Sequence, residues 1–212
     1  SAVGDDLTTA PVRERLSSAA RSLAPGAAGA VVSGALRRAD AVTSQKAPYT
    51  DEMLIGYSSD ASTDDLDAAF VVAKAAQPGW DRLGGRARGR ILRAMGDALE
   101  ASRDRLIGLC VREAGKTLAD AIAEVREAVD FCRYYAHLAE SQFESPTSLP
   151  GPAGETNYLE LRGRGVFVCI SPWNFPLAIF TGQVCAALAA GNAVLAKPAE
   201  QTPLIAAEAV RL

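Results

Sequence analysis

The stretch Val166-Phe-Val-Cys-Ile-Ser-Pro-Trp-Asn-Phe-Pro176 decides the fold of this chain. Its first five residues are apolar and rich in β-branched side chains, which is typical of a short strand, and the rest form a loop. A second apolar run, Ala193-Val-Leu-Ala196, leads in the same way into Lys197-Pro-Ala-Glu-Gln-Thr-Pro203. An apolar helical stretch over 177–190 joins the two runs. This order predicts a βαβ unit with two parallel strands.

Three polar side chains directly follow these predicted strands. Asn174 comes after the first strand, and Lys197 and Glu200 come after the second. Ligands of open α/β sheets bind just past the carboxyl ends of the strands. The sequence therefore predicts an amide, an ammonium and a carboxylate at the edge of one crevice.

Both loops resemble those of the NAD-dependent aldehyde dehydrogenase superfamily, and Arg112-Glu-Ala-Gly-Lys-Thr117 and Ala123-Glu-Val-Arg-Glu-Ala-Val-Asp-Phe131 extend the resemblance. The segments 149–158 and 164–183 resemble more narrowly one module of the bifunctional proline-utilisation flavoproteins (PutA). That module is the Δ1-pyrroline-5-carboxylate, or glutamate-semialdehyde, dehydrogenase. The resemblance is strong from about 63 to 212 and weak over 1–60.

The resemblance implies an α/β, aldehyde dehydrogenase-like fold. We expect a helical N-terminal layer and part of a Rossmann-like parallel sheet, with residues 149–165 projecting as a β-hairpin that mediates oligomer contacts. Residues 1–60 are expected to be irregular, and 61–212 to form the N-terminal part of the NAD-binding domain. In the family the nucleophilic cysteine and the general base lie further downstream. We therefore expect this chain to be a fragment that lacks the catalytic domain and is inactive by itself.

The implied activity is NAD-dependent oxidation of L-glutamate γ-semialdehyde to L-glutamate in proline catabolism. An FAD-dependent proline dehydrogenase domain precedes the segment if the parent is bifunctional. Two alternatives stay open. One is a stand-alone aldehyde dehydrogenase of another specificity, and the other is a truncated, non-catalytic nucleotide-binding or assembly module.

Asn174 is the predicted catalytic residue of this chain. A carboxamide N–H can hold a developing oxyanion, and the resemblance assigns that task to this asparagine. The alternative is a turn asparagine between two prolines that satisfies backbone groups.

The predicted cofactor site combines the two strand ends. The resemblance implies that Lys197 and Glu200 hold the adenosine ribose of NAD, and the Glu200 carboxylate disfavours a 2′-phosphate. The alternative is a solvated ion pair, which contributes little. The full set of predicted cofactor residues is Ile170, Ser171, Pro172, Trp173, Lys197, Pro198, Ala199 and Glu200.

Three residues are predicted on the substrate side. Phe175 borders the aldehyde pocket, where an apolar lining keeps a site dry. Glu124 matches a glutamate that lines the substrate tunnel in semialdehyde dehydrogenases, and the alternative is an ordinary exposed helix carboxylate. Phe131 lies on a neighbouring helical turn and could line the same channel, as could Arg133.

The helical part of the chain is read from apolar spacing. Ser62 or Thr63 caps a helix with Leu66 and Phe70 on its apolar side, ending near Pro78. Further helices are predicted over 86–109 and from Thr117 onward, and an alternating strand over 158–162.

Composition narrows the class of protein. The chain has 212 residues, a net charge of −3 and no cluster of basic residues, which argues against a nucleic-acid surface. No apolar run reaches the roughly 20 residues of a membrane span.

His137 is the only histidine, and no cysteine pair has metal-ligand spacing, so no metal site is predicted. The four cysteines favour buried free thiols, a cytoplasmic location is expected, and the resemblance implies a homo-oligomer.

Overall fold

The computed structural model describes residues 1–37, 41–50 and 52–212. These residues form the helices α1 (Ala10–Arg21), α2 (Thr63–Arg82), α3 (Gly85–Ala101), α4 (Arg103–Ala114), α5 (Leu118–Gln142), α6 (Ala178–Ala189) and α7 (Pro203–Arg211). They also form the strands β1 (Gly26–Ala28), β2 (Val31–Val32), β3 (Ala35–Leu36), β4 (Thr43–Lys46), β5 (Leu54–Ser58), β6 (Thr147–Leu149), β7 (Asn157–Leu159), β8 (Val166–Ile170) and β9 (Ala193–Lys197).

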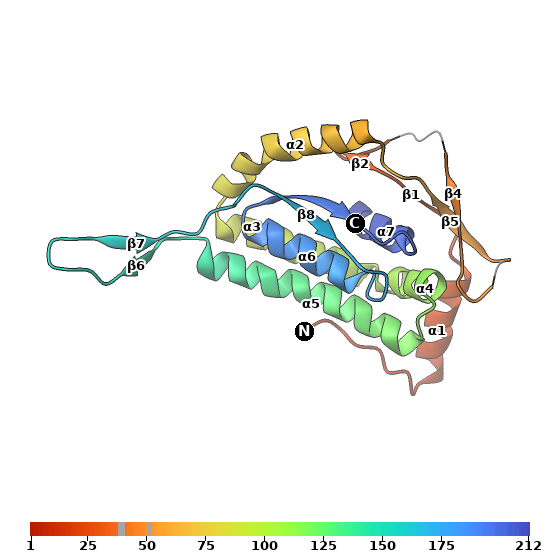
Figure 1. The fold of residues 1–212 in the computed structure, drawn as a ribbon. Helices are drawn as coiled ribbons and strands as arrows, with labels where there is room; N and C mark the ends of the chain where they lie inside the picture. The colour runs from red at the N-terminus through yellow and green to blue at the C-terminus, as the bar shows by residue number, and fades with distance from the viewer. Residues whose placement is uncertain (38–40, 51) are drawn as a thin grey trace.

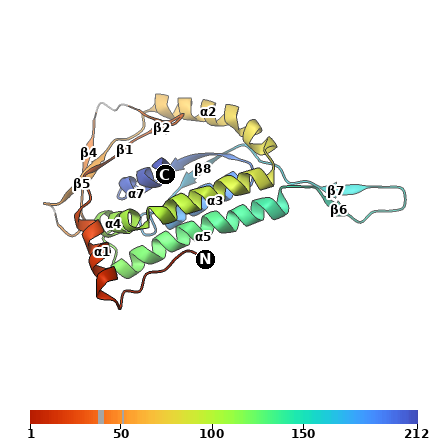
Figure 2. The ribbon, with the colours of Figure 1, turned by 180° about the vertical axis from the view of Figure 1, so that it is seen from behind.

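Helix α5 is the centre of a helical layer. It packs against α3 on one side and α6 on the other (Figures 1 and 2). Thr117 begins α5 by accepting the N–H of Asp120, so this predicted helix start is confirmed. The fully buried side chains of the layer exclude water from one continuous core; they include Leu16, Leu92, Leu106, Ile107, Val129 and Ile205.

The predicted βαβ unit is confirmed. Strands β8 and β9 pair in parallel with Ile170 opposite Lys197, and α6 joins them. The polar loops that follow the two strands therefore leave the sheet at the same edge.

Helix α2 differs from its prediction in length and in orientation. Its N-cap Ser62 forms a capping box with Asp65, but the helix continues through Pro78 to Arg82. Leu66 and Phe70 are exposed rather than packed. The helix is attached by polar bonds instead, because the side chain of Trp80 donates to the carbonyl of Leu188 at 2.9 Å.

Two other boundaries differ from the sequence pattern. The helical spacing over 86–109 is interrupted at Ser102, where α3 ends and α4 begins. Within residues 1–60, which were expected to be irregular apart from a short helix over 12–23 and a short strand over 53–57, the structure has α1 and the strands β1 to β5. Strands β1 to β4, with two to four residues each, are too short to produce a visible alternation.

The hairpin β6–β7 projects from the body of the molecule (Figure 1). Thr147 pairs with Leu159 and Leu149 with Asn157, so the paired part begins two residues before the predicted segment. The apolar side chains of Tyr158 and Leu159 are at least half exposed on it. The role of the hairpin in oligomer contacts stays a prediction.

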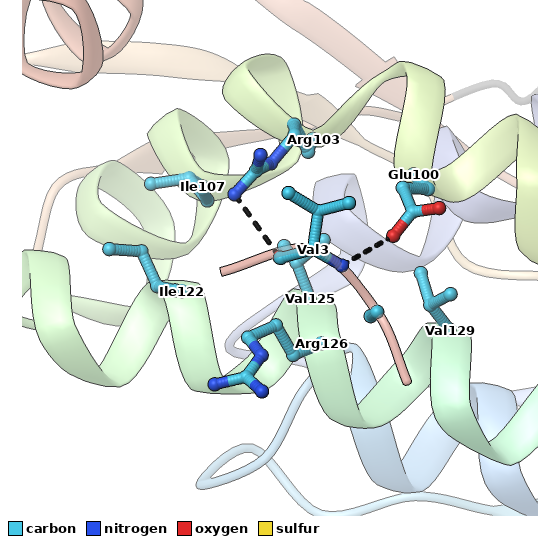
Figure 3. Close-up of a pocket in the computed structure, with 9 residues that line it drawn as sticks. Val3, Glu100, Arg103, Ile107, Ile122, Val125, Arg126 and Val129 are labelled. Carbon is cyan, nitrogen blue, oxygen red and sulfur yellow. Dashed lines mark hydrogen bonds between the residues drawn. The ribbon is translucent and has the colours of Figure 1, made fainter. Parts of the chain in front are cut away.

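The first residues of the chain lie along the helical layer. The Val3 N–H donates to Glu100 at 2.7 Å, and Arg103 donates to the Val3 carbonyl at 3.3 Å (Figure 3). The N–H of Ala2 donates to Asp130 of α5 at 2.9 Å. These bonds hold the segment across α3, α4 and α5.

Candidate functional site

The two predicted site loops lie side by side because their strands are bonded up to the last residue. The Ser171 N–H donates to the carbonyl of Lys197 at 3.0 Å, one residue past the ladder. Gln183 of α6 donates to the Ile170 carbonyl at 3.3 Å and lies 3.3 Å from the hydroxyl of Ser171. The end of β8 is therefore tied to both β9 and α6.

Asn174 lies in the loop between β8 and α6, and its side chain is exposed. Trp173 and Phe175 on either side of it are 58% and 42% exposed. The structure thus presents a carboxamide flanked by open aromatic surfaces at the carboxyl end of β8. An amide in this place can donate to a ligand without first giving up a protein partner.

Lys197 and Glu200 lie at the carboxyl end of β9, and both are exposed. They do not form an ion pair with each other, so the solvated pair considered above is not present. Glu200 accepts one bond, from the adjacent Gln201 side chain at 3.2 Å. Ala199 is buried beneath the loop. The charged groups of this loop therefore face outward.

Glu124 is completely enclosed, unlike the ordinary exposed helix carboxylate that was the alternative. Its Oε2 accepts the N–H groups of Leu177 at 3.2 Å and Ala178 at 2.9 Å. The Lys116 ammonium lies 3.0 Å from Oε1 and 4.5 Å from the centre of the Phe175 ring. The carboxylate is thus fixed between α5 and the start of α6, beside the loop that carries Asn174. Its contact with substrate stays a prediction.

Glu113 is a second enclosed carboxylate at the site, and sequence reasoning missed it. Its two oxygens accept the N–H groups of Leu204 at 2.7 Å and Ile205 at 2.8 Å, at the start of α7. Burial raises the pKa of the Glu113 carboxyl to about 7, although the two N–H donors oppose that shift. No local signal marks it, because its partners lie 91 and 92 residues further along the chain.

Phe131 faces α6 at Gly182. A Cβ at position 182 would lie 2.9 Å from the Phe131 ring, so only glycine allows the ring to approach this closely. Phe131 also stacks on Tyr135, with ring centres 6.0 Å apart. Arg133 points elsewhere, because it bonds Asp97 and Glu100 of α3. The role of Phe131 in a substrate channel stays a prediction.

The four cysteines are buried and free. Burial raises the pKa of the thiols of Cys110 and Cys169. The sulfur atoms of Cys132 and Cys185 are 3.5 Å apart, and this contact together with burial raises the pKa of the Cys185 thiol. The same contact lowers the pKa of the Cys132 thiol. Thiolates are the reactive form of cysteine, so the raised pKa values keep Cys110, Cys169 and Cys185 in the unreactive thiol form.

Other features of the described residues lie away from the two strand ends. One small pocket, with no room for a water molecule, lies where the N-terminal segment meets α3, α4 and α5 (Figure 3). A second, of about 200 Å³, lies at the base of the hairpin beside Arg88 and Arg162. Residues 1–37, 41–50 and 52–212 contain no group of three potential metal ligands. None of the helices in those ranges is long and apolar enough to cross a membrane.

Comparisons with known proteins agree with this arrangement. The "Bifunctional protein PutA" of Klebsiella aerogenes is 47% identical over 165 residues, which are 78% of this chain and 12% of that protein. The crystal structure of proline utilization A (PutA) from Bdellovibrio bacteriovorus has a TM-score of 0.93 at 31% identity and covers 98% of this chain and 22% of its own. A 1-pyrroline-5-carboxylate dehydrogenase from Thermus with bound NAD has a TM-score of 0.92 at 28% identity and covers 98% of this chain and 41% of its own.

This chain therefore spans a small part of the length of its relatives. The similarity to the two solved structures extends over nearly the whole chain, and it confirms the α/β, aldehyde dehydrogenase-like fold. The sequence profile of the aldehyde dehydrogenase family matches residues 37–212. The chain belongs to the aldehyde dehydrogenase family.

Proposed function

We propose that the protein containing this chain oxidises L-glutamate γ-semialdehyde to L-glutamate with NAD, as a step of proline catabolism. The observation that carries the proposal is the placement of Asn174, Lys197 and Glu200 at one sheet edge, in a chain 47% identical to PutA. Several of the similar proteins are named 1-pyrroline-5-carboxylate dehydrogenase, and the one from Thermus has NAD bound. These names support the aldehyde and the cofactor together.

In this proposal Asn174 donates an amide N–H to the oxygen of the aldehyde as negative charge develops on it. Such a donor is fixed before the reaction, so it stabilises the transition state more than the ground state. The attacking thiolate and the base that activates water come from a further part of the protein, because the thiols described above are buried. Phe175 and Phe131 supply apolar walls for the aldehyde, with Glu124 nearby.

The residues at the two strand ends fit NAD. Exposed Lys197 and Glu200 offer an ammonium donor and a carboxylate acceptor, which suit the two hydroxyl groups of a ribose. Residues 170–173 and 198–199 form the rest of this edge. When bound, NAD would supply the hydride acceptor, and Lys197 and Glu200 would hold its adenosine ribose.

Further parts of the proposal concern the whole protein. The Klebsiella relative is called bifunctional, which supports an additional FAD-dependent proline dehydrogenase domain. The projecting hairpin supports a homo-oligomer. The wide, irregular spacing of the four cysteines, all buried and free, supports a reducing compartment such as the cytoplasm.

The test is an assay of the full-length protein with glutamate semialdehyde and NAD, followed by the absorbance of NADH. The expected result is formation of L-glutamate and NADH in equal amounts. Faster oxidation of unrelated aldehydes than of the semialdehyde would favour a dehydrogenase of another specificity. No oxidation of any aldehyde would favour a non-catalytic module.

A further inference from the structure

The helices that follow the two site loops begin without a cap of their own. A helix leaves its first N–H groups unpaired, and a polar side chain at the N-cap position usually accepts one of them. The N-cap residue of α6 is Leu177, which has no acceptor. The N-cap residue of α7 is Thr202, whose hydroxyl makes no capping bond.

Two buried glutamates from the helical layer supply the missing acceptors. Glu124 of α5 accepts the first N–H groups of α6, and Glu113 of α4 accepts those of α7. Both residues are buried, because only 3% of Glu113 and 1% of Glu124 is exposed. In such surroundings hydrogen bonds are strong, because solvent does not compete for the donors or the acceptors. Each contact therefore joins a helix start rigidly to the layer behind it.

The two helix starts are also the ends of the two site loops. Asn174 lies in the loop that ends at Leu177, and Glu200 lies in the loop that ends at Thr202. The strand end holds each loop on one side, and the glutamate holds it on the other. The exposed side chains of Asn174 and Glu200 have few contacts of their own, so these two anchors determine where they lie.

We propose that Glu124 and Glu113 are positioning residues for the two halves of the site, Glu124 for the Asn174 loop and Glu113 for the Lys197–Glu200 loop. This inference rests on the proposed function, because it assigns the first loop to the aldehyde oxygen and the second to NAD. The two glutamates should therefore affect different quantities. Loss of Glu124 should slow the chemical step, and loss of Glu113 should weaken cofactor binding.

The test uses Glu113→Gln and Glu124→Gln in the full-length protein. In the first variant the amide N–H₂ group faces one of the two backbone N–H donors, so one bond is lost. In the second it faces the Lys116 ammonium, and two sets of donors repel each other. Glu127→Gln is the matched control, because Glu127 is an exposed glutamate of the same helix as Glu124.

Two quantities are measured for each variant, the Kd of NAD by calorimetry and kcat at saturating NAD. Glu113→Gln should raise the Kd of NAD by on the order of 10-fold and change kcat less than about twofold. Glu124→Gln should lower kcat by on the order of 10-fold and change the Kd of NAD less than about twofold. Glu127→Gln should change neither. A general loss of structure would change both the Kd and kcat in both Gln variants, and that result would overturn the proposal. Wild-type values of the Kd and kcat in both Gln variants would also overturn it.

Glu113→Asp and Glu124→Asp provide a second set, because each keeps the charge at a shorter reach. Their values should lie between those of the wild type and of the Gln variants. If none of the four variants yields folded protein, the glutamates have a purely structural role and the proposal fails. Failure of the proposed function is distinguishable, because it appears in the wild type as a lack of NAD binding or of aldehyde oxidation.

Discussion

The buried carboxyl of Glu113 should make the stability of the protein depend on pH. Its pKa is raised to about 7 from the ordinary value of 4.5, chiefly by burial. Between these two values the folded state binds a proton that the unfolded state has released. The contribution of this proton to stability is therefore complete below about 4.5 and is lost as the pH rises through about 7.

The size of the effect follows from the two pKa values. At about 1.36 kcal/mol for each pH unit, the full contribution is about 3 kcal/mol, of which about 2.5 kcal/mol is lost between pH 5 and pH 8. Glu113→Gln removes the titrating group but keeps the shape. The free energy of unfolding of this variant, relative to the wild type, should therefore rise by about 2.5 kcal/mol over that interval.

The assay is urea unfolding of wild type, Glu113→Gln and the control Glu127→Gln at pH 5 and pH 8. An infrared titration, taken as the difference between wild type and Glu113→Gln, should show the protonated carboxyl disappear with a midpoint near 7. The same relative stability at both pH values, together with an infrared midpoint below 5, would refute the reasoning. It would mean that the N–H groups of Leu204 and Ile205 outweigh burial.

Three further predictions test the proposed function. Asn174→Ala in the full-length protein should lower kcat by on the order of 100-fold with nearly unchanged NAD affinity, and an unchanged kcat would return Asn174 to the role of a turn residue. Glu200→Gln should weaken NAD binding and reduce discrimination against NADP in calorimetric titrations, whereas equal affinity in both proteins would contradict the ribose assignment. The chain expressed alone should form no NADH from glutamate semialdehyde and should associate in solution through its exposed apolar surface. Turnover that a substitution of one of its four cysteines abolishes would show that the nucleophile lies within this chain.

Local signals in the sequence were sufficient for the central elements. The apolar runs at Val166–Ile170 and Ala193–Lys197 and the apolar stretch between them have the period and order of a βαβ unit, and the structure has that unit. Thr117 before an apolar helical stripe marks the start of α5. Parallel strands end at the same edge of a sheet, so the loops that carry Asn174 and Glu200 leave it together, as predicted.

The prediction of α2 shows where such signals fail. Leu66 and Phe70 have the spacing of a buried face, yet they are exposed, and the helix is attached through Gln77 and Trp80. Gln77 donates to the carbonyl of Gly191, 114 residues away. The orientation of a helix depends on the groups that it meets, and the apolar spacing of its own residues does not contain that information.

The sequence by itself thus determined the βαβ unit, the start of α5 and the grouping of Asn174, Lys197 and Glu200 at one sheet edge, because these depend on contacts between near neighbours and on the geometry of parallel strands. Only the tertiary structure decided that Glu113 and Glu124 hold the starts of α7 and α6. Their partners lie 91 to 92 and 53 to 54 residues further along the chain. A buried carboxylate is stable only where donors converge on it, and the donors converge only when the helical layer has packed against the sheet edge.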